Sequence, residues 1–534
     1  MKRYLSLLAL LILGVSGCQS FKEPPIATTE NLFQSRKRDA ADDLLKDITV
    51  LTIEDAQRIA LKNNPDYKSA AYAVNAAKMA YYQALGAYSP TFGASFSMSN
   101  THTGDSHDLK NTVGTGKNRR FSTSTSITAN WLVFDGLARY FNAKAAKAGE
   151  KYQLAMEENA ARNLLSGVVY AYNSILLARA ELEIAKSDLE FQQICLKETE
   201  LKQEVGTVPY SDVLNFKIRA RSAENAMLVA ERSYALATYA LAVLMGYPDG
   251  KIPEWISFDE IKVDVDAVLP SVEVYLDAAL ANRPDLRAVR ENLNIRKYAK
   301  YSAYSAYSPT ISAFAEFNVS TSNTRSYRPN SIHSHSTTPS FAYGASANWT
   351  IFNGFVRFNK VREAQANEAI AKFNVVSAWL SVIQEVRDSY TNYIFSVNQA
   401  KLYEQILAYS TEQRDLVAKE YEAGTIGITR LNEVQNDLIN AESTLVSAYL
   451  NIKNAKVQLD TAAGLITQEF YLKSESDIPQ AENTNVEVQK GNEIIVKSNQ
   501  SAFIKELDDV AEEEEEVATQ DGKVVVPEQK DKVK

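Results

Sequence analysis

The sequence contains little cysteine, histidine, glycine or proline. Only two of its 534 residues are Cys and four are His, beside 20 Gly and 14 Pro. The two cysteines, Cys18 and Cys195, lie far apart, so no disulfide framework is expected, and Cys195 reads as a small packed side chain. The spacings of a phosphate-cradling glycine loop, a zinc site and a nucleophile elbow are missing too. We therefore predict no enzyme, no catalytic residues, no metal and no cofactor.

The four histidines gather in two polar stretches, His102 and His107 in the first, His333 and His335 in the second. A His-x-His pair could bind a metal across adjacent loops. These stretches have no Cys and few carboxylates, so a solvated surface is the simpler interpretation.

Basic charge is not concentrated anywhere. The net charge of the chain is −9, from 66 acidic and 57 basic side chains. Residues 471–534 hold 16 acidic and 8 basic side chains, which leaves 50 and 49 for residues 1–470. The acidity thus belongs to a tail that we expect to be disordered. The balanced body argues against a nucleic-acid partner.

The N-terminus is typical of an export signal. Lys2 and Arg3 precede an apolar run, Leu5–Leu13, which is too short to span a bilayer comfortably. The run ends in Val15-Ser16-Gly17-Cys18, similar to the lipobox of bacterial lipoproteins, in which the Cys is lipidated. A plain secretory peptide with an incidental Cys is the alternative. In lipoproteins, Gln19 after the Cys implies the outer membrane rather than the inner one.

Two stretches are almost free of helix breakers. Residues 355–423 contain neither Gly nor Pro, and residues 137–205 contain only Gly149 and Gly167. Each predicts a helix on the order of 100 Å long. Each ends at a Gly-Thr turn, and a returning helix is predicted at 210–245 or 429–463. Paired rods in a coiled coil or bundle are expected.

The body of the chain is a tandem repeat. Landmark residues recur at a spacing of 218 or 219, which is too regular for chance. The recurring pairs include Pro65/Pro284, Pro90/Pro309, Trp131/Trp349, Gly136/Gly354, Gly206/Gly424 and Gly246/Gly464.

Each copy opens with a short helix, N-capped in the first copy by Thr52 with Asp55 three residues later, and a second helix follows. The hydrophobic period then changes to two, which predicts strands within 91–99, 121–133, 311–319 and 341–351, with polar loops at 100–120 and 321–340. The predicted strands are nearly uncharged apart from Glu316 and long enough to cross a bilayer.

Tyrosines mark the place where helix gives way to strand. They are Tyr81, Tyr82 and Tyr88 in the first copy and Tyr301, Tyr304 and Tyr307 in the second. A membrane-interface girdle and a helical core are both consistent with this placement.

Four strands cannot close a membrane barrel, because known single-chain barrels begin at about eight strands. An open sheet edge in lipid leaves backbone groups unsatisfied. The strands must therefore close by association between chains.

The duplicated helix–strand–strand–long helix–Gly turn–helix unit, with its Trp…Phe-Asp/Asn-Gly and Gly-Thr signatures, resembles the TolC-type outer-membrane efflux proteins, lipoprotein branch. The resemblance covers residues 50–466. It implies a mainly α-helical protein with a membrane β-barrel: a homotrimer whose 12-stranded barrel takes four strands from each chain, continued by a long α-helical barrel across the periplasm. Such proteins are passive exit ducts of tripartite efflux or type I secretion systems, and they dock at their helical tips onto a periplasmic adaptor that links them to an inner-membrane pump.

The resemblance also implies a periplasmic gate. Asp212 and Tyr421 match two of the family's closing residues, whereas its Arg is Ile426 here. The family's acidic constriction falls on Arg430 and Glu433. We expect Arg430 to replace the missing Arg and pair with Asp212; the alternative is that Asp212 is an ordinary helix N-terminal acid. The adaptor-docking tips are expected at Gly206, Thr207, Gly424 and Thr425.

The expected division is signal peptide (1–17), lipid-anchored N-terminal linker (18–48), first repeat (49–250), connection (251–268), second repeat (269–470) and acidic tail (471–534). Two other classes stay open. A periplasmic coiled-coil structural or adaptor lipoprotein would explain the rods but not the duplicated strands. A surface adhesin would explain lipidation but not the two matching turns.

Overall fold

The computed structural model describes residues 45, 48–103, 118–247, 250–259, 261, 269–326 and 332–467. The predicted signal peptide, Cys18, His107 and the acidic tail lie outside them. Contacts divide the chain into two units, and the long helices run through both. Unit 1 holds 1–69, 163–265 and 395–457, and unit 2 holds 70–162, 266–394 and 458–534.

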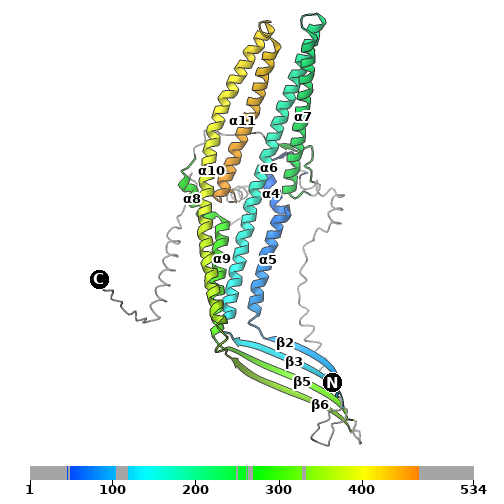
Figure 1. The fold of residues 1–534 in the computed structure, drawn as a ribbon, viewed down its shortest axis with the longest axis vertical. Coiled ribbons are helices and arrows are strands. Elements are labelled where there is room, and N and C mark those ends of the chain that lie inside the picture. Colours follow the sequence, from blue (N-terminus) through cyan, green and yellow to red (C-terminus); the bar gives the residue numbers. More distant parts are fainter. Residues whose placement is uncertain are drawn as a thin grey trace, which may run out of the picture. The chain divides into compact units, whose positions relative to one another are not determined.

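Both repeats have the predicted order of elements (Figure 1). The first contains α4 (Ile53–Asn63), α5 (Pro65–Gly86), β2 (Thr91–Thr103), β3 (Asn118–Phe134), α6 (Ala138–Glu204) and α7 (Tyr210–Leu244). The second contains α8 (Val272–Asn282), α9 (Pro284–Tyr304), β5 (Thr310–Ser326), β6 (Ile332–Asn348), α10 (Val356–Glu422) and α11 (Ile428–Ala462). A short strand, β1 (Val50–Leu51), pairs in parallel with β4 (Ser257–Phe258).

The first helix begins where the sequence predicts. The Thr52 hydroxyl accepts a hydrogen bond from the Asp55 backbone N–H at 3.2 Å and donates to the Asp55 carboxylate at 2.7 Å. The cap satisfies a backbone donor that a helix N-terminus otherwise leaves open. The prediction for the start of α4 is confirmed.

The core of unit 1 is built around Tyr172 of α6. Its ring is fully buried among residues of α4, α6 and α7. Its hydroxyl donates to the Leu51 carbonyl at 2.7 Å and accepts from the Asp259 N–H at 2.9 Å. Burial raises the pKa of this phenol. The hydroxyl thus ties the small β1–β4 sheet to the long helix.

Helix α7 is, among the described residues, the one helix long and apolar enough to cross a membrane. Length and composition alone are weak evidence for a membrane span. The buried residues of α7 begin at Val213, Phe216, Ala220 and Ala223, spaced by three or four. That spacing is the seam of a helix packed on a neighbour.

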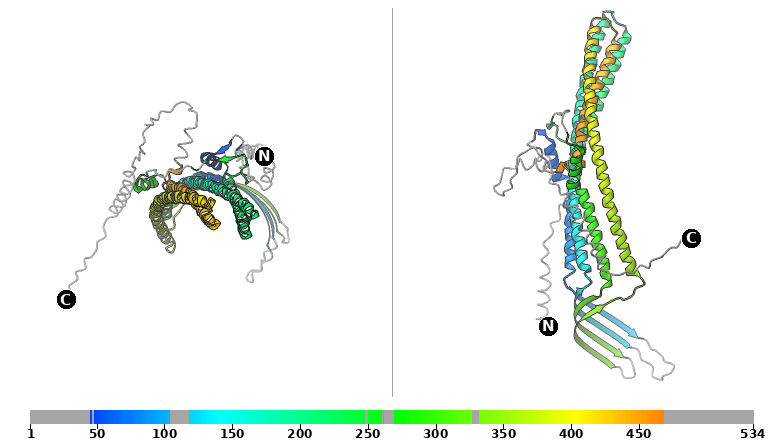
Figure 2. Two further views of the ribbon diagram at one scale, coloured as in Figure 1. Left: turned by 90° about the horizontal axis from the view of Figure 1, so that it is seen from above. Right: turned by 90° about the vertical axis from the view of Figure 1, so that its left-hand side faces the viewer.

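Unit 2 contains a four-stranded antiparallel sheet in the order β2-β3-β5-β6, whose strands lie side by side and curve together (Figures 1 and 2). The strands have 13, 17, 17 and 17 residues, so the predicted loops at 100–120 and 321–340 are wrong in extent. Alternating Ser and Thr continue the pleat into stretches that look like loops. Pro339 lies within β6, at the edge of the sheet that a single chain forms.

The last strand also ends earlier than predicted, at Asn348. The indole N–H of Trp349 donates instead to the Tyr307 carbonyl at 3.0 Å, as Trp131 does to Tyr88 at 2.9 Å in the first repeat. Both tryptophans therefore pin the end of a strand to the end of a helix.

None of the six junction tyrosines is buried in the chain. Tyr82, Tyr88, Tyr304 and Tyr307 are exposed. The guanidinium of Arg139 lies 5.1 Å from the Tyr88 ring centre, and the matching distance from Arg357 to Tyr307 is 5.3 Å. The rings therefore do not form a buried core within the single chain, and the membrane-interface girdle stays a prediction.

Candidate functional site: the sheet and the hairpin tips

One face of the sheet is lined by hydroxyl groups. Paired residues share a face, so the register places whole rows of Ser and Thr across the four strands. Ser99, Ser122, Ser322 and Ser336 form one such row. Neighbouring hydroxyls bond to each other, at 2.7 Å between Ser99 and Ser122. This hydroxyl face is neutral and wettable along most of its length.

The hydroxyl face carries one acidic and one basic side chain. Glu316, the seventh residue of β5, shares a row with Gly93, Thr128 and Ala342, and it is the single acidic residue of the four strands. Arg120 lies on the same face near the loop end. A carboxylate in a polar lining is placed to select between ions of opposite sign.

Phe314 interrupts the hydroxyl face beside Glu316. It is 40% exposed, and its ring lies over Gly344 of β6, where a Cβ would come within 3.1 Å of the ring. Phe314 was not predicted as a functional residue, although the sequence marks it as the one large aromatic out of phase with the alternation of its strand.

The opposite face of the sheet is apolar and exposed. The register puts Phe92, Ala129, Ala315 and Tyr343 in one row and Ala94, Ile127, Phe317 and Phe341 in the next. Phe92 is 75% exposed and Tyr343 77%. Large apolar side chains left in water over a whole sheet face mark a lipid or protein contact.

The turn from strand to long helix is built alike in both repeats. Gly136 and Gly354 have φ of 68° and 66°, and the next residues, Leu137 and Phe355, are also left-handed. In the first repeat the Arg139 guanidinium bonds Asp135 at 3.0 Å and the carbonyls of Ala87 and Val133. Such ties hold a strained backbone in place.

The tips of the two helical hairpins are nearly identical. The N–H of Thr207 donates to the Lys202 carbonyl at 2.9 Å and its hydroxyl to the same oxygen at 2.7 Å. Thr425 repeats both bonds with Glu420, at 3.0 and 2.8 Å. Gly206 and Gly424 supply the positive φ that this helix ending requires. Each tip thus ends in an exposed Gly-Thr turn whose Thr is bonded twice to the helix before it.

The predicted gate residues lie around these tips, and the structure adds Lys202 to them. The Lys202 ammonium lies 3.3 Å from the Tyr421 hydroxyl and 4.5 Å from its ring centre, which joins α6 to α10. Arg430 pairs with Glu433 at 3.1 Å, and both are exposed. The recorded side-chain contact of Asp212 is a long one, 3.5 Å from Ser211. A pairing of Asp212 with Arg430 between chains stays a prediction.

Ile426 stands where the resemblance expects an Arg. It packs against a small buried cluster formed by Val417, Leu431 and Val434. An apolar anchor therefore holds the second tip at the position where the family uses a charge.

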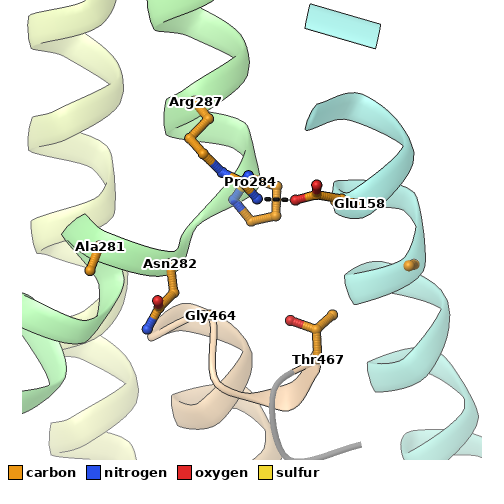
Figure 3. A pocket seen from close by; sticks show the side chains of 8 residues that line it. Glu158, Ala281, Asn282, Pro284, Arg287, Gly464 and Thr467 are labelled. Atoms are coloured by element: carbon orange, nitrogen blue, oxygen red, sulfur yellow. Dashed lines mark hydrogen bonds and ion pairs between the residues drawn. The ribbon is translucent and has the colours of Figure 1, made fainter. Parts of the chain in front are cut away.

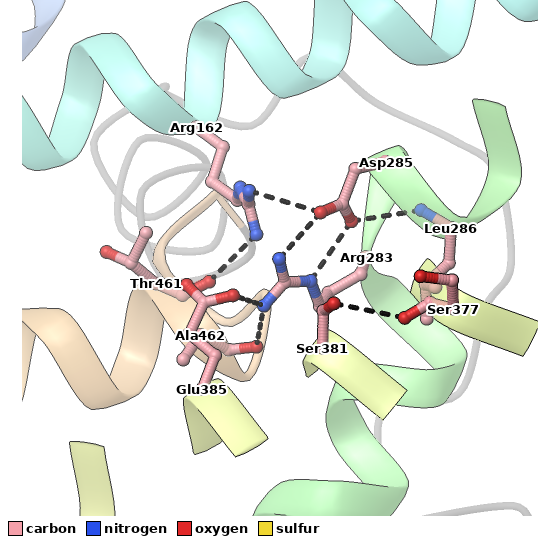
Figure 4. Close-up of polar contacts among 9 residues, drawn as sticks. All are labelled: Arg162, Arg283, Asp285, Leu286, Ser377, Ser381, Glu385, Thr461 and Ala462. Carbon is pink, nitrogen blue, oxygen red and sulfur yellow. Dashed lines mark hydrogen bonds and ion pairs between the residues drawn. The ribbon is translucent and has the colours of Figure 1, made fainter. Parts of the chain in front are cut away.

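A charged cluster lies where α8 meets α9 (Figure 4). Arg283 is buried and bonds Asp285 at 2.6 Å, Glu385 at 2.6 Å and the Ala462 carbonyl at 3.0 Å. Burial works against the charge of Arg283, but bonds to the two carboxylates raise its pKa overall. The pKa of Arg162, 3.6 Å from Asp285, is lowered by burial and by Arg283. The pKa of Asp285 is lowered because its partners outweigh its burial.

Beside this cluster lies a cavity of about 330 Å³ (Figure 3). Arg287 of α9 forms an ion pair with Glu158 of α6 at its wall, and Asn282, Gly464 and Thr467 complete much of the lining. Among the described residues no group of three or more His, Cys, Asp or Glu could hold a metal.

Comparison with known proteins agrees with this geometry. The chain is 24% identical over 430 residues to the alkaline protease secretion protein AprF of Pseudomonas aeruginosa, covering 78% of this chain and 84% of AprF. It is 22% identical over 372 residues to the outer membrane protein TolC of Escherichia coli, covering 68% and 74%. The Campylobacter jejuni CmeC outer membrane channel has the same fold, with a TM-score of 0.61, 17% identity, and coverage of 86% and 94%.

Fold and site together define an outer-membrane channel. The outer membrane efflux protein family model matches residues 57–247 and 275–465, once for each repeat, and the chain belongs to this family. It resides in the outer membrane and acts as an exit duct for efflux or type I secretion.

Proposed function

We propose that the duct is a homotrimer whose barrel closes when β6 of one chain pairs with β2 of the next. The observation that carries this proposal is the pair of open edges. Because the order is β2-β3-β5-β6 and every pair is antiparallel, β2 and β6 run in opposite directions. Head-to-tail pairing then continues the antiparallel ladder without a break and leaves no edge in lipid.

The two faces of the sheet support the same arrangement. The apolar face would meet the lipid, and the hydroxyl face would line the lumen. From Ile311 to Val319 the apolar residues of β5 alternate over nine positions. At ~3.3 Å per residue and a tilt of about 40° they span roughly 20 Å of height, close to the apolar band of outer-membrane barrels.

The helical hairpins extend into the periplasm, and their Gly-Thr tips, at Gly206, Thr207, Gly424 and Thr425, dock onto an adaptor that connects the duct to an inner-membrane pump. Support comes from the exposure of both turns and from the two hydrogen bonds that hold each Thr to the preceding helix. A rigid tip loses little conformational entropy on binding. The duct itself is passive and carries no enzymatic function.

The periplasmic gate consists of Asp212, Tyr421, Arg430 and Glu433, with Lys202 holding Tyr421. In a trimer the exposed Arg430 and Glu433 of three chains would form a ring of mixed charge. Asp212 lies in the first turn of α7, from which a neighbouring chain's Arg430 could draw it into an ion pair.

Cys18 carries a lipid anchor after removal of residues 1–17. A Cys18→Ser chain exported by an unrelated signal peptide should lose labelled palmitate. Persistent label on that chain would contradict the assignment.

A cross-link between the two edges tests the trimer. One cysteine is placed at Ser97 on β2 and a second at each hydroxyl-face position of β6 from Ser334 to Ser346 in turn, because the stagger of a closed barrel sets which of them meets Ser97 of the next chain. In the trimer we expect covalent trimers of at least one double variant under mild oxidation and none from any single variant. Cross-linking that stops at monomers and random dimers would contradict head-to-tail closure.

A further inference from the structure

A row of basic side chains crosses the loop end of the apolar face. The register places His102 opposite Arg119, Arg119 opposite Arg325, and Arg325 opposite His333. All four side chains are exposed. With adjacent strands ~4.8 Å apart, the row is about 15 Å long and crosses all four strands.

This basic row lies on the same face as the apolar side chains. Successive residues of a strand alternate between faces, so Arg119 shares its face with Phe121, and His102 with Met98. The row is therefore one step of the alternation beyond Phe121 and two beyond Met98. On β5 the row lies three steps beyond Val319, so it stands past the loop-side end of the apolar alternation, on the lipid-facing side rather than in the lumen.

No negative charge balances the row within the described strands. Their single acidic residue, Glu316, lies on the other face, in the middle part of β5 and nine residues from Arg325. The Arg325 Nε–H donates to His333 Nδ1 at 3.1 Å, which fixes the plane of the guanidinium. A planar, oriented guanidinium without a carboxylate partner is suited to a phosphate, which it can bind through two parallel hydrogen bonds.

We propose that this row binds the phosphate groups of anionic lipids at the border of the membrane, with Arg119 and Arg325 as the principal ligands. The inference rests on the proposed trimer, in which the apolar face meets lipid. Cationic side chains at the edge of an apolar band reach the headgroup level and gain from a negative surface. Closure of three chains turns the row into a basic ring around the barrel.

A matched pair of variants tests the inference. Arg119→Gln with Arg325→Gln removes the charge of the row, whereas Arg120→Gln changes the same charge one residue away on the hydroxyl face. Phosphatidylglycerol is titrated into the full-length protein in neutral detergent, and bound lipids are counted by native mass spectrometry. Each arginine near an anionic lipid accounts for about a fivefold change in affinity, so the double variant should bind roughly 25-fold more weakly.

Arg120→Gln should bind phosphatidylglycerol like the unaltered chain, and high salt should weaken binding to the unaltered chain. Equal affinity of the double variant and the unaltered chain would overturn the inference. So would an equal loss in Arg120→Gln, or full displacement of the lipid by inorganic phosphate at the same concentration. If the lipid-binding inference alone fails, the unaltered chain and the double variant are both still trimers. If the proposed trimer fails, the unaltered chain is a monomer.

Discussion

In each repeat the junction between the first two helices, α4–α5 or α8–α9, is hydrogen-bonded to the end of the last helix, α7 or α11. The two repeats make this connection with different side chains. In the first repeat, Asn64 between α4 and α5 donates its amide to the Leu244 carbonyl at 3.0 Å. Its side-chain oxygen accepts from the N–H groups of Asp66 and Tyr67. One neutral side chain thus caps the end of α7 and the start of α5.

The second repeat divides these tasks among charged residues. Arg283 donates to the Ala462 carbonyl at the end of α11, and Asp285 accepts from the Leu286 N–H at the start of α9. Glu385, which balances Arg283, stands 218 residues after Gly167, so the first repeat has no side chain at that place. The duplicated backbone therefore determines which carbonyl needs a hydrogen-bond donor. The residue that donates to it differs between the two repeats.

Removing Arg283 should show the largest effect. Arg283→Met leaves Glu385 without its cation, leaves Asp285 with only Arg162 at 3.6 Å, and leaves the Ala462 carbonyl without its guanidinium donor. Breaking a buried ion pair in this way should cost about 3 kcal/mol of folding free energy, against about 1–2 kcal/mol for Asn64→Ala. The urea midpoint of the helical circular dichroism in detergent measures both. Equal losses of folding free energy in the two variants would mean that the charged and the neutral junction contribute equally to stability.

The next largest effect is expected at the glycines that follow α7 and α11, and its size should differ between the two repeats. A Cβ on Gly246 would meet the backbone of Asn63 at 2.8 Å, whereas one on Gly464 would meet Arg283 at 3.3 Å; both residues have positive φ. We expect Gly246→Ala to cost roughly 2–3 kcal/mol and Gly464→Ala roughly 1–2 kcal/mol. The same urea titration measures both losses of folding free energy. A larger loss in Gly464→Ala than in Gly246→Ala would contradict the prediction.

Low pH should reduce the stability that the α8–α9 junction contributes, and it should leave the contribution of the α4–α5 junction unchanged. The folded-state pKa of Asp285 is lowered, so its contribution is fully present above the ordinary Asp pKa of about 3.9 and is lost as the pH falls below that value through the folded pKa. Asp285→Asn should flatten the acid limb of stability against pH. If stability falls with decreasing pH as steeply in Asp285→Asn as in the unaltered chain, other carboxylates cause the acid sensitivity.

Cation preference should depend on Glu316 of the second repeat. Its counterpart 219 residues earlier is Ser97, so within the described strands Glu316 is the one carboxylate on the hydroxyl face. Glu316→Gln should move the cation-to-anion permeability ratio of single channels toward unity. Ser97→Ala is the matched control and should leave the ratio unchanged; a shift there of the same size would remove Glu316 from the explanation.

The smallest effect is expected at the tips. Lys202→Met removes the ammonium over the Tyr421 ring, a contact of about 0.5–1 kcal/mol, and should raise the channel's open probability roughly two- to fivefold. Its counterpart Glu420 has no such contact with the ring, and Glu420→Gln is the control. An unchanged open probability in Lys202→Met would limit the contact to a structural role.

The element order and all four helix-ending glycines were predictable from the sequence, because breakers are scarce and recur at a fixed spacing. The extent of the strands was not, since Ser and Thr continue the alternation through segments rich in turn formers, as around Pro339. Lys202 was missed because its contact with Tyr421 joins helices 219 residues apart. The charged cluster at Arg283 was missed because its members come from four separate helices.

The most direct test of the account is the native mass of the protein extracted from outer membranes in mild detergent. Closure of the barrel between β6 and β2 of successive chains predicts three times the mass of the mature chain, falling to one chain only on heating. A species with the mass of a single chain before heating would contradict it, because four strands with two open edges cannot line a channel through lipid.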